Sequence, residues 1–147
     1  MSNLYHLAYI SKSAILPARA EIEQALRAIL RAARQKNSSM GITGALLFSG
    51  GYFCQVIEGD LDALETLYET IQMDERHTEC TVLFFEPLET RGFGAWDMAF
   101  AGIEEEMRFP IEDIKQSHDE LAMHETGEQV VAVLSELVAQ HQATVDR

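Results

Sequence analysis

The sequence predicts an α+β fold with a mixed sheet, two helices on one face of that sheet, and a C-terminal helical extension. Apolar residues alternate in five short runs, as in β-strands, and recur at three- and four-residue spacing in two longer runs, as in amphipathic helices. In chain order these runs read βαββαβ plus a fifth strand, which is the ferredoxin-like arrangement. With 147 residues, the chain is long enough for one domain with its own core.

The first two predicted elements are a strand and a helix. Residues 4–11 are predicted to form a strand whose side chains alternate between two faces, with Tyr5, Leu7 and Tyr9 on one face and Leu4, His6, Ala8 and Ile10 on the other. Residues 19–35 carry apolar side chains at helical spacing with charged side chains opposite, so this helix is expected to cover the sheet. Residues 37–41, which are Asn, Ser, Ser, Met and Gly, are expected to end it.

A hairpin and a second helix follow. Residues 42–48 and 52–58 alternate as two strands, and Ser49-Gly50-Gly51 between them is a tight-turn signal. Asp60 can cap a second helix, whose apolar residues repeat at helical spacing up to residue 74.

Two further strands complete the predicted sheet. Residues 81–86 form the fourth strand, after which Pro87 and Gly92-Phe93-Gly94 break the chain. Residues 96–100 alternate once more as a fifth strand, and this places Trp96 and Met98 on the same face.

The C-terminal part differs from the rest in carrying only helical patterns. Residues 110–124 and 127–142 are two amphipathic stretches, the second with a clear apolar stripe. We therefore divide the chain into residues 1–102, which contain the sheet, and residues 103–147, which are too short for a catalytic domain.

Charge and cysteine content limit the classes of function. Eleven basic and 24 acidic residues give a net charge of −13, which argues against binding to nucleic acid or to an anionic membrane surface. Cys54 and Cys80 lie in apolar runs without metal-ligand spacing, so they are expected to be buried free thiols in a reducing compartment. No signal peptide or membrane-spanning run is present, and a cytoplasmic protein is expected.

Gln55 is the residue that the fold alone does not explain. It shares one strand face with Phe53 and Ile57, so its primary amide is expected to point into an apolar layer. Leaving a buried amide unpaired costs roughly 1–3 kcal/mol, so the amide requires neighbouring backbone, a side chain such as a tyrosine, or a bound polar ligand as its partner. In the predicted topology Tyr9 lies beside Gln55 on the adjacent central strand. The two would then form the floor of an apolar slot between the helices, which is a typical site for a flat cofactor.

Five segments in this order and at these spacings resemble the BLUF domains, which are blue-light sensors that use flavin. The segments are LYHLAYIS at 4–11, Asn37 followed by GITGALL at 41–47, FCQVIEG at 53–59, DERH at 74–77, and Phe93-x-x-Trp96-x-Met98. The resemblance covers about residues 3–100, so residues 1–102 would be the flavin-binding photosensor domain. Residues 103–147 would then be a helical cap, a signalling segment or an oligomerisation segment.

The resemblance implies the roles of the central residues. Tyr9 would donate an electron and a proton to the excited flavin, and Gln55 would link Tyr9 to the flavin N5 and C4 carbonyl edge. An amide suits this position because it offers both a donor and an acceptor and can rotate or tautomerise. Asn37 would hold the N3 and C4 carbonyl side of the ring, although Asn37 also suits a helix C-cap, and the two roles can coexist.

Other residues have a cofactor role and an ordinary alternative. Ile29 and Ile71 lie on apolar helix faces and would enclose the ring, or they are plain core. Arg76 and His77 match a family position near the flavin, or they are solvated residues that complement a helix dipole.

Trp96 and Met98 match the pair through which the family passes the light signal outward, or they are simply buried. Phosphate contacts of the cofactor are unassigned, with Lys12, Arg31 and Arg34 as candidates.

The expected function is that of a non-enzymatic photoreceptor carrying FAD, with FMN or riboflavin as other possible flavins. Light would rearrange the Gln55 hydrogen bonds, give a red-shifted state and alter the interaction with an unidentified downstream protein, and the receptor itself would be a homo-oligomer. The alternatives are a flavin-dependent oxidoreductase and a ferredoxin-like interaction domain without a chromophore. The oxidoreductase has little support, because the chain contains no Gly-rich nicotinamide-binding loop.

Overall fold

The computed structural model describes residues 4–13, 19–73, 77–94, 98–104, 106–110 and 119–145. These residues form the expected βαββαβ order followed by a fifth strand and a C-terminal helix. The elements are β1 (Leu4–Ser13), α1 (Arg19–Met40), β2 (Thr43–Ser49), β3 (Tyr52–Asp60), α2 (Leu61–Met73), β4 (His77–Pro87), β5 (Ala99–Glu104) and α4 (Glu120–Val145).

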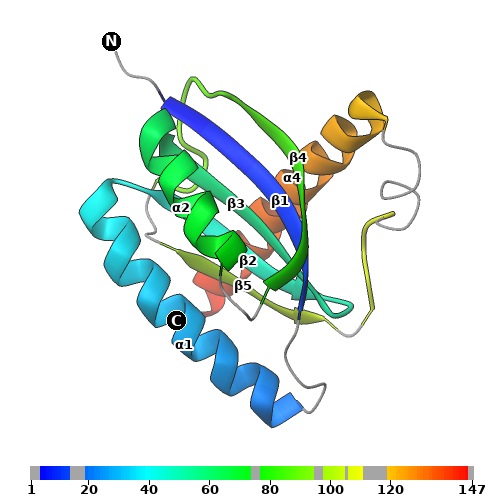
Figure 1. Ribbon diagram of the computed structural model, residues 1–147. Coiled ribbons are helices and arrows are strands. Elements are labelled where there is room, and N and C mark those ends of the chain that lie inside the picture. Colours follow the sequence, from blue (N-terminus) through cyan, green and yellow to red (C-terminus); the bar gives the residue numbers. More distant parts are fainter. Residues whose placement is uncertain are drawn as a thin grey trace.

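The sheet has five strands in the order β4-β1-β3-β2-β5. The first four pair antiparallel, whereas β5 pairs parallel with β2, so the predicted mixed sheet is confirmed. In Figure 1, α1 and α2 lie on one side of the sheet and α4 lies on the other. The ferredoxin-like arrangement therefore places β1 and β3 as central neighbours.

Two separate apolar layers follow from the alternation of side chains along the strands. Leu7 and Tyr9 of β1 pack with the helix side chains Leu26 and Leu64 between the sheet and α1/α2. Ala8, the neighbour of both in sequence, packs in the opposite layer under α4. The apolar side chains of β1 and β3 that belong to these layers thus divide between them according to their parity.

Helix α1 ends five residues later than the sequence pattern predicts, at Met40 instead of Gln35. The polar run at its end does not break the helix. Gly41 does so, with a φ of +70°, and the Ile42 N–H donates to the Asn37 carbonyl at 2.9 Å. This bond belongs to the Schellman motif, in which a glycine in the left-handed region closes the last turn. Asn37 is therefore in the last full turn of α1 and is not its capping residue.

The hairpin between β2 and β3 is confirmed. Ser49 pairs with Tyr52, and Gly50 and Gly51 form the two-residue turn with φ values of +56° and +83°. Positive φ at both central positions matches the twist of the two strands, which is why glycine is suited to both.

Strands β4 and β5 differ from the predicted ranges. β4 begins at His77, four residues before the predicted Thr81, because its pairing with β1 continues to the last residue of that strand. β5 begins at Ala99, where pairing with Ala45 of β2 starts, and extends to Glu104. Met98 therefore precedes the strand instead of lying inside it.

The predicted interruption at Gly127 is wrong, because α4 is one helix that runs through this glycine. A β-carbon at Gly127 would overlap the ring of Phe84 on β4. The glycine thus allows close approach of the helix to the sheet and does not end the helix. Val130, Leu134 and Val138 then continue the buried stripe of α4. In the described part of the chain, no helix combines the length and the apolar character needed to cross a membrane.

Candidate functional site

The site is centred on a buried pair at the middle of the sheet. Tyr9 and Gln55 are direct partners in the antiparallel β1/β3 ladder, and both side chains point to the α1/α2 side. Tyr9 is fully buried and Gln55 is 5% exposed. The Tyr9 hydroxyl donates to the Gln55 side-chain oxygen. The strand register therefore brings the tyrosine and the amide together.

The nitrogen of the Gln55 side-chain amide also makes a hydrogen bond. Gln55 Nε2 donates to the Met98 sulfur at 3.3 Å, and Arg34 Nε on α1 donates to the Met98 carbonyl at 3.0 Å. A hydrogen-bonded chain thus runs from β1 through β3 to the residue just before β5, and α1 holds its last member.

A pocket lies above this chain, between α1 and α2. Its described lining residues are Ile29, Ala32, Ala33, Lys36, Asn37, Gln55, Leu67, Thr70, Ile71 and Met98. Apolar side chains from both helices form the walls, and the Gln55 amide and Met98 come from the sheet side. The pocket is the slot that the sequence predicts.

Asn37 adds a polar group to one edge of the pocket. It is fully buried in the last turn of α1. Although the residue has other contacts, its side-chain oxygen accepts no hydrogen bond within the described part of the chain. A ligand N–H placed at this edge would supply the hydrogen bond that a buried carbonyl oxygen requires.

Lys36 and Thr70 link the two helices across the same pocket, because Lys36 Nζ donates to Thr70 Oγ1 at 3.4 Å. Both side chains are exposed. The pocket therefore has a polar, cationic rim at the solvent side and an apolar interior.

Tyr9 also contacts a second tyrosine. The rings of Tyr9 and Tyr68 on α2 are 5.4 Å apart in an edge-to-face arrangement. Burial, together with the nearby Cys80 thiol, raises the pKa of Tyr68 to about 12. Tyr68 is thus a neutral phenol at physiological pH and places no charge beside Tyr9.

On the far side of β3, burial and the Glu104 carboxylate raise the pKa of Cys54 to about 12. Cys54 and Cys80 are free cysteines, and Cys54 is buried as predicted, whereas Cys80 is only partly buried. Cys54 is consequently an unreactive buried thiol in the layer under α4.

A buried carboxylate fixes the chain segment that leads to Met98. Glu58 is 2% exposed and accepts hydrogen bonds from the backbone N–H groups of Gly92 at 2.7 Å and Phe93 at 3.0 Å. It also accepts one from the Thr43 hydroxyl at 2.9 Å, and Arg91 donates to the Glu58 carbonyl at 3.2 Å. Three residues after Gln55 on the same strand, Glu58 thus holds the loop between β4 and β5.

A cluster of two histidines and two glutamates joins α4 to the sheet. His124 Nε2 lies 2.9 Å from Glu86 on β4, and His124 Nδ1 lies 3.0 Å from Glu128 on α4 itself. His6 on β1 contacts the same Glu86 carboxylate at 3.3 Å. The hydrogen bond to Glu86, with a further contribution from Glu128, raises the pKa of His124 above its usual value.

Not every predicted site residue can be placed. Tyr9, Ile29, Asn37, Gln55, Ile71 and Met98 all belong to the pocket or to the hydrogen-bonded chain beneath it. Arg76 and Trp96 lie outside the described residues, and for His77 only the backbone is described, at the start of β4. Their predicted roles remain predictions.

The structure gives the three phosphate candidates other surroundings than the pocket lining. Arg34 is bound to the Met98 carbonyl, Arg31 is exposed on α1, and Lys12 lies 4.0 Å from Glu79. None of the three is among the described residues that line the pocket, whereas Lys36 is.

Sequence reasoning missed half of the pocket lining. Ala32, Ala33 and Lys36 on α1, and Leu67 and Thr70 on α2, were not singled out, although all five line the pocket. Ala32, Ala33 and Lys36 lie three, four and seven residues after Ile29, Leu67 lies four residues before Ile71, and Thr70 lies three residues after Leu67. Extending the helical repeat from the predicted positions Ile29 and Ile71 would have found them.

The geometry fits a flat, mostly apolar ring with polar edges. Ile29 and Ile71 are placed on opposite helices, and Gln55 and Asn37 present amides at the inner side of the pocket. Amide groups can both donate to and accept from the N–H, N and C=O groups along one edge of a flavin ring. The residues present therefore suit this cofactor class.

Comparison with known proteins agrees with this geometry. The family model described as BLUF, sensors of blue-light using FAD, matches residues 4–99. The photoactivated adenylate cyclase subunit beta of Euglena longa is 36% identical over 115 residues, which make up 77% of this chain and 13% of that protein. The chain thus spans a small part of the length of this relative.

Solved structures are similar over most of the chain. The dark-state structure of the BLUF protein BlrB is 30% identical, with a TM-score of 0.68 and coverage of 96% of this chain and 98% of BlrB. A bacterial light-regulated adenylyl cyclase is 27% identical, with a TM-score of 0.63 and coverage of 85% of this chain and 40% of the cyclase. Since the family model matches well over half of the sequence and the fold agrees with that of solved members, the chain belongs to the BLUF family, the sensors of blue-light using FAD.

Proposed function

We propose that this protein is a blue-light photoreceptor that binds FAD non-covalently in the pocket between α1 and α2. The observation that carries the proposal is the hydrogen-bonded chain from Tyr9 through Gln55 to Met98 beneath this pocket. A phenol, an amide and a thioether in this order provide an oxidisable donor, a switchable hydrogen-bonding group and an acceptor.

The proposed holding residues follow from the pocket. Asn37 and Gln55 would bond the polar edge of the ring, while Ile29 and Ile71 would pack on its apolar part. Arg76 and His77 are proposed to contact the cofactor on the basis of the family motif alone. When bound, the flavin supplies blue-light absorption and an excited state that accepts an electron.

Tyr9 is proposed as the donor of that electron. Once oxidised, a phenol is strongly acidic, and the Gln55 side-chain oxygen is the acceptor of the Tyr9 O–H hydrogen bond. Tyr9 thus gives up one electron and one proton, and both return to it when the cycle closes. Because nothing is consumed overall, we propose a sensor and not an enzyme.

Gln55 is proposed as the switch. In the described orientation its oxygen accepts from Tyr9 and its nitrogen donates to the Met98 sulfur. If the amide turns over, its nitrogen faces Tyr9 and its oxygen faces Met98. A thioether sulfur cannot donate a hydrogen bond to that oxygen. The contact with Met98 is therefore lost, and we propose that Met98 and Trp96 pass this change outward.

The output is proposed to reach a separate effector protein. The relatives named as light-activated cyclases show that this kind of domain is found in proteins with an effector activity. Residues 103–147 are proposed as the signalling or oligomerisation segment, since α4 packs in the same layer as Cys54 and Val56, the sequence neighbours of Gln55. A cytoplasmic homo-oligomer remains a prediction.

The test is the visible absorption spectrum of the purified protein before and after blue light, followed through recovery in the dark. Flavin bands that shift to the red and return are expected. A flavin that only bleaches, or that turns over steadily with an added hydride donor, would favour an oxidoreductase. A colourless protein that does not take up added FAD would indicate an interaction domain without a chromophore.

A further inference from the structure

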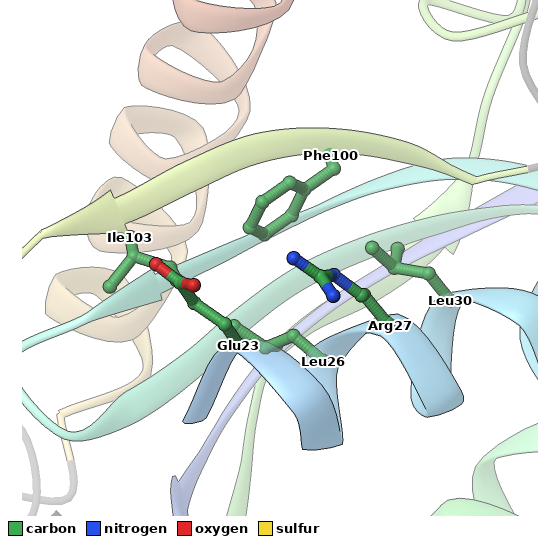
Figure 2. Close-up of a pocket in the computed structure, with 6 residues that line it drawn as sticks. All are labelled: Glu23, Leu26, Arg27, Leu30, Phe100 and Ile103. Atoms are coloured by element: carbon green, nitrogen blue, oxygen red, sulfur yellow. The ribbon is translucent and has the colours of Figure 1, made fainter. Parts of the chain in front are cut away.

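A second cavity lies beside the proposed flavin pocket and shares no described lining residue with it. It has a volume of about 380 Å³ and lies between α1 and β5. Its lining residues are Glu23, Leu26, Arg27, Leu30, Phe100 and Ile103. Figure 2 shows the side chains of α1 directed towards Phe100 and Ile103 on the strand. We call this cavity the α1/β5 groove.

The floor and the rim of the groove differ in chemistry. Leu26, Leu30, Phe100 and Ile103 supply an apolar floor, and all four belong to the layer between the sheet and the helices. Glu23 and Arg27 supply charged groups at its edge (Figure 2). An apolar floor with a charged rim is the usual form of a groove that accepts an amphipathic helix.

Helix α1 is basic in a strongly acidic protein. It contains five basic side chains and two acidic ones, a net charge of +3, whereas the whole chain carries −13. Arg27 and Arg31 lie one turn apart and both are exposed. Neither has an ion pair or a hydrogen bond within the described part of the chain. In a chain with more than twice as many acidic as basic residues, two free arginines beside an apolar groove are positioned for acidic groups of another molecule.

We propose that the α1/β5 groove is the docking surface for an acidic amphipathic helix of a partner protein. The apolar side chains of that helix would occupy the floor between Leu26 and Phe100. Its carboxylates would pair with Arg27 and Arg31, for which the planar guanidinium groups are well suited. Among the described residues, α4 does not cover the groove, because it packs on the other face of the sheet.

The groove is connected to the proposed switch, and this step rests on the proposed function. Met98 receives the Gln55 amide on its sulfur and Arg34 of α1 on its carbonyl, and β5 begins at the next residue. Phe100, which lies two residues after Met98, is part of the apolar floor of the groove. Loss of the Gln55 contact in the lit state removes one of these two constraints on Met98. The relative position of α1 and β5, and with it the affinity for the partner helix, then differs between dark and lit states.

The experiment uses the full-length protein and two designed helical peptides with the same leucine stripe. One peptide carries glutamate on its polar face and the other carries lysine. A far-red label reports binding by fluorescence anisotropy without driving the photocycle. The glutamate peptide is expected to bind the dark protein roughly three- to tenfold more tightly than the lysine peptide, as exposed charge pairs contribute. Raising the salt concentration should reduce this preference.

Matched charge reversals locate the site. Arg27→Glu and Arg31→Glu should each abolish the preference for the glutamate peptide. Lys12→Glu makes the same change in net charge on β1, where the side chain is 57% exposed, and should preserve the preference. Equal effects of all three variants, or equally tight binding of the lysine peptide, would overturn the proposal.

Two other occupants give distinct results. Arg27-dependent sedimentation with phosphatidylserine vesicles, without peptide binding, would show that the surface binds membranes instead. A dimer that dissociates in Arg27→Glu, without peptide binding, would show that a second copy occupies the groove. Either result overturns the docking of a partner helix.

The effect of light on peptide affinity is measured together with the absorption spectrum of the same sample. A red shift together with a change in peptide affinity of a few fold is expected. A normal red shift with identical affinities in dark and light would overturn the link to Gln55. Failure of the red shift itself would contradict the proposed function, and the effect of Arg27→Glu in the dark would still decide whether the groove binds the peptide.

Discussion

Tyr9 and Gln55 face each other across the two central strands, and the Tyr9 hydroxyl donates to the Gln55 side-chain oxygen. This bond fixes the orientation of the amide, because the oxygen is engaged by Tyr9 and the nitrogen is left to donate to Met98. In the proposed mechanism, this cross-strand pair determines which contacts are lost when the amide turns.

Replacing Tyr9 with phenylalanine should keep the flavin bound and abolish the red-shifted state. The change removes only the hydroxyl of a fully buried ring, so the pocket keeps its shape while the proposed electron and proton donor is lost. Light-minus-dark absorption spectra measure the effect. Tyr68→Phe is the matched control, since Tyr68 contacts the Tyr9 ring but is not a member of the hydrogen-bonded chain from Tyr9 through Gln55 to Met98, and it should photocycle as the parent does. A red shift in Tyr9→Phe would remove Tyr9 from the mechanism.

Replacing Gln55 with leucine should also leave flavin bound, because the apolar walls come from α1 and α2. No hydrogen-bond switch can then operate, so the lit-state red shift should be absent even though the flavin is photoreduced or quenched in other ways. Absorption before and after blue light measures this. Gln72→Leu, on an exposed position of α2, makes the same chemical change outside the site and should behave as the parent. A parent-like photocycle in Gln55→Leu would place the switch elsewhere.

Replacing Glu58 with glutamine should destabilise the loop between β4 and β5. The carboxylate accepts from the Gly92 and Phe93 backbone N–H groups and from Thr43, and a glutamine has one oxygen to serve these donors. Losing a charge-assisted bond at a buried site costs about 1.5–3 kcal/mol of unfolding free energy, measured by urea denaturation.

Glu89→Gln is the control for Glu58, since Glu89 is exposed in the same loop. Amide hydrogen exchange at Gly92 and Phe93 should increase in Glu58→Gln and not in the control. An unfolding free energy equal to that of the parent would show that Glu58 does not support this loop.

Gly127→Ala should destabilise the attachment of α4, although alanine is the better helix former by about 1 kcal/mol. The added methyl group overlaps the Phe84 ring, and forcing extra volume into a packed contact typically costs about 1–3 kcal/mol. Denaturant unfolding of Gly127→Ala, Phe84→Leu and the double variant gives the coupling between the two sites. The double variant should recover part of the loss caused by Gly127→Ala. Additive effects would show that the helix moves aside without strain.

The contribution of His124 to stability should decrease as pH rises. Its pKa is raised in the folded protein by Glu86 and then Glu128, so the protonated imidazole is the form that the fold stabilises. The stabilisation by His124 is fully present at pH values below the pKa of a histidine in the unfolded protein, which is about 6.5. It is lost as pH increases through the higher folded value. Glu86 on β4 and Glu128 on α4 contact His124, and His6 on β1 contacts the same Glu86 carboxylate.

Unfolding free energies of the parent and His124→Gln as a function of pH measure this effect. The two curves should differ at acidic pH and converge at alkaline pH. Glu125→Gln, an exposed change on the same turn, should not reproduce the convergence. A difference that is constant, or that grows with pH, would contradict the prediction.

The sequence alone determined the fold class and the centre of the site. The period-2 alternation within residues 4–11 and within residues 52–58 allows Tyr9 and Gln55 to share the helix-covered face, because alternation along a strand is a local property. The Gly50-Gly51 turn fixes the β2/β3 register for the same reason, since turn length sets the pairing. The motifs then pointed to the family that the comparisons confirm.

The tertiary structure alone decided the contacts between elements that are distant in the chain. No local pattern shows that Arg34 binds the Met98 carbonyl or that Glu58 binds the backbone of the loop at Gly92. Nor does any local pattern show that the ring of Phe84 packs against Gly127, where a β-carbon would overlap it. The end of α1 likewise depends on a bond from Ile42 back to Asn37, where the polar run suggested an earlier stop. The period of the hydrophobic pattern specifies which side of a helix or strand is buried. Which residues meet there depends on how the elements pack, and that is a property of the assembled fold.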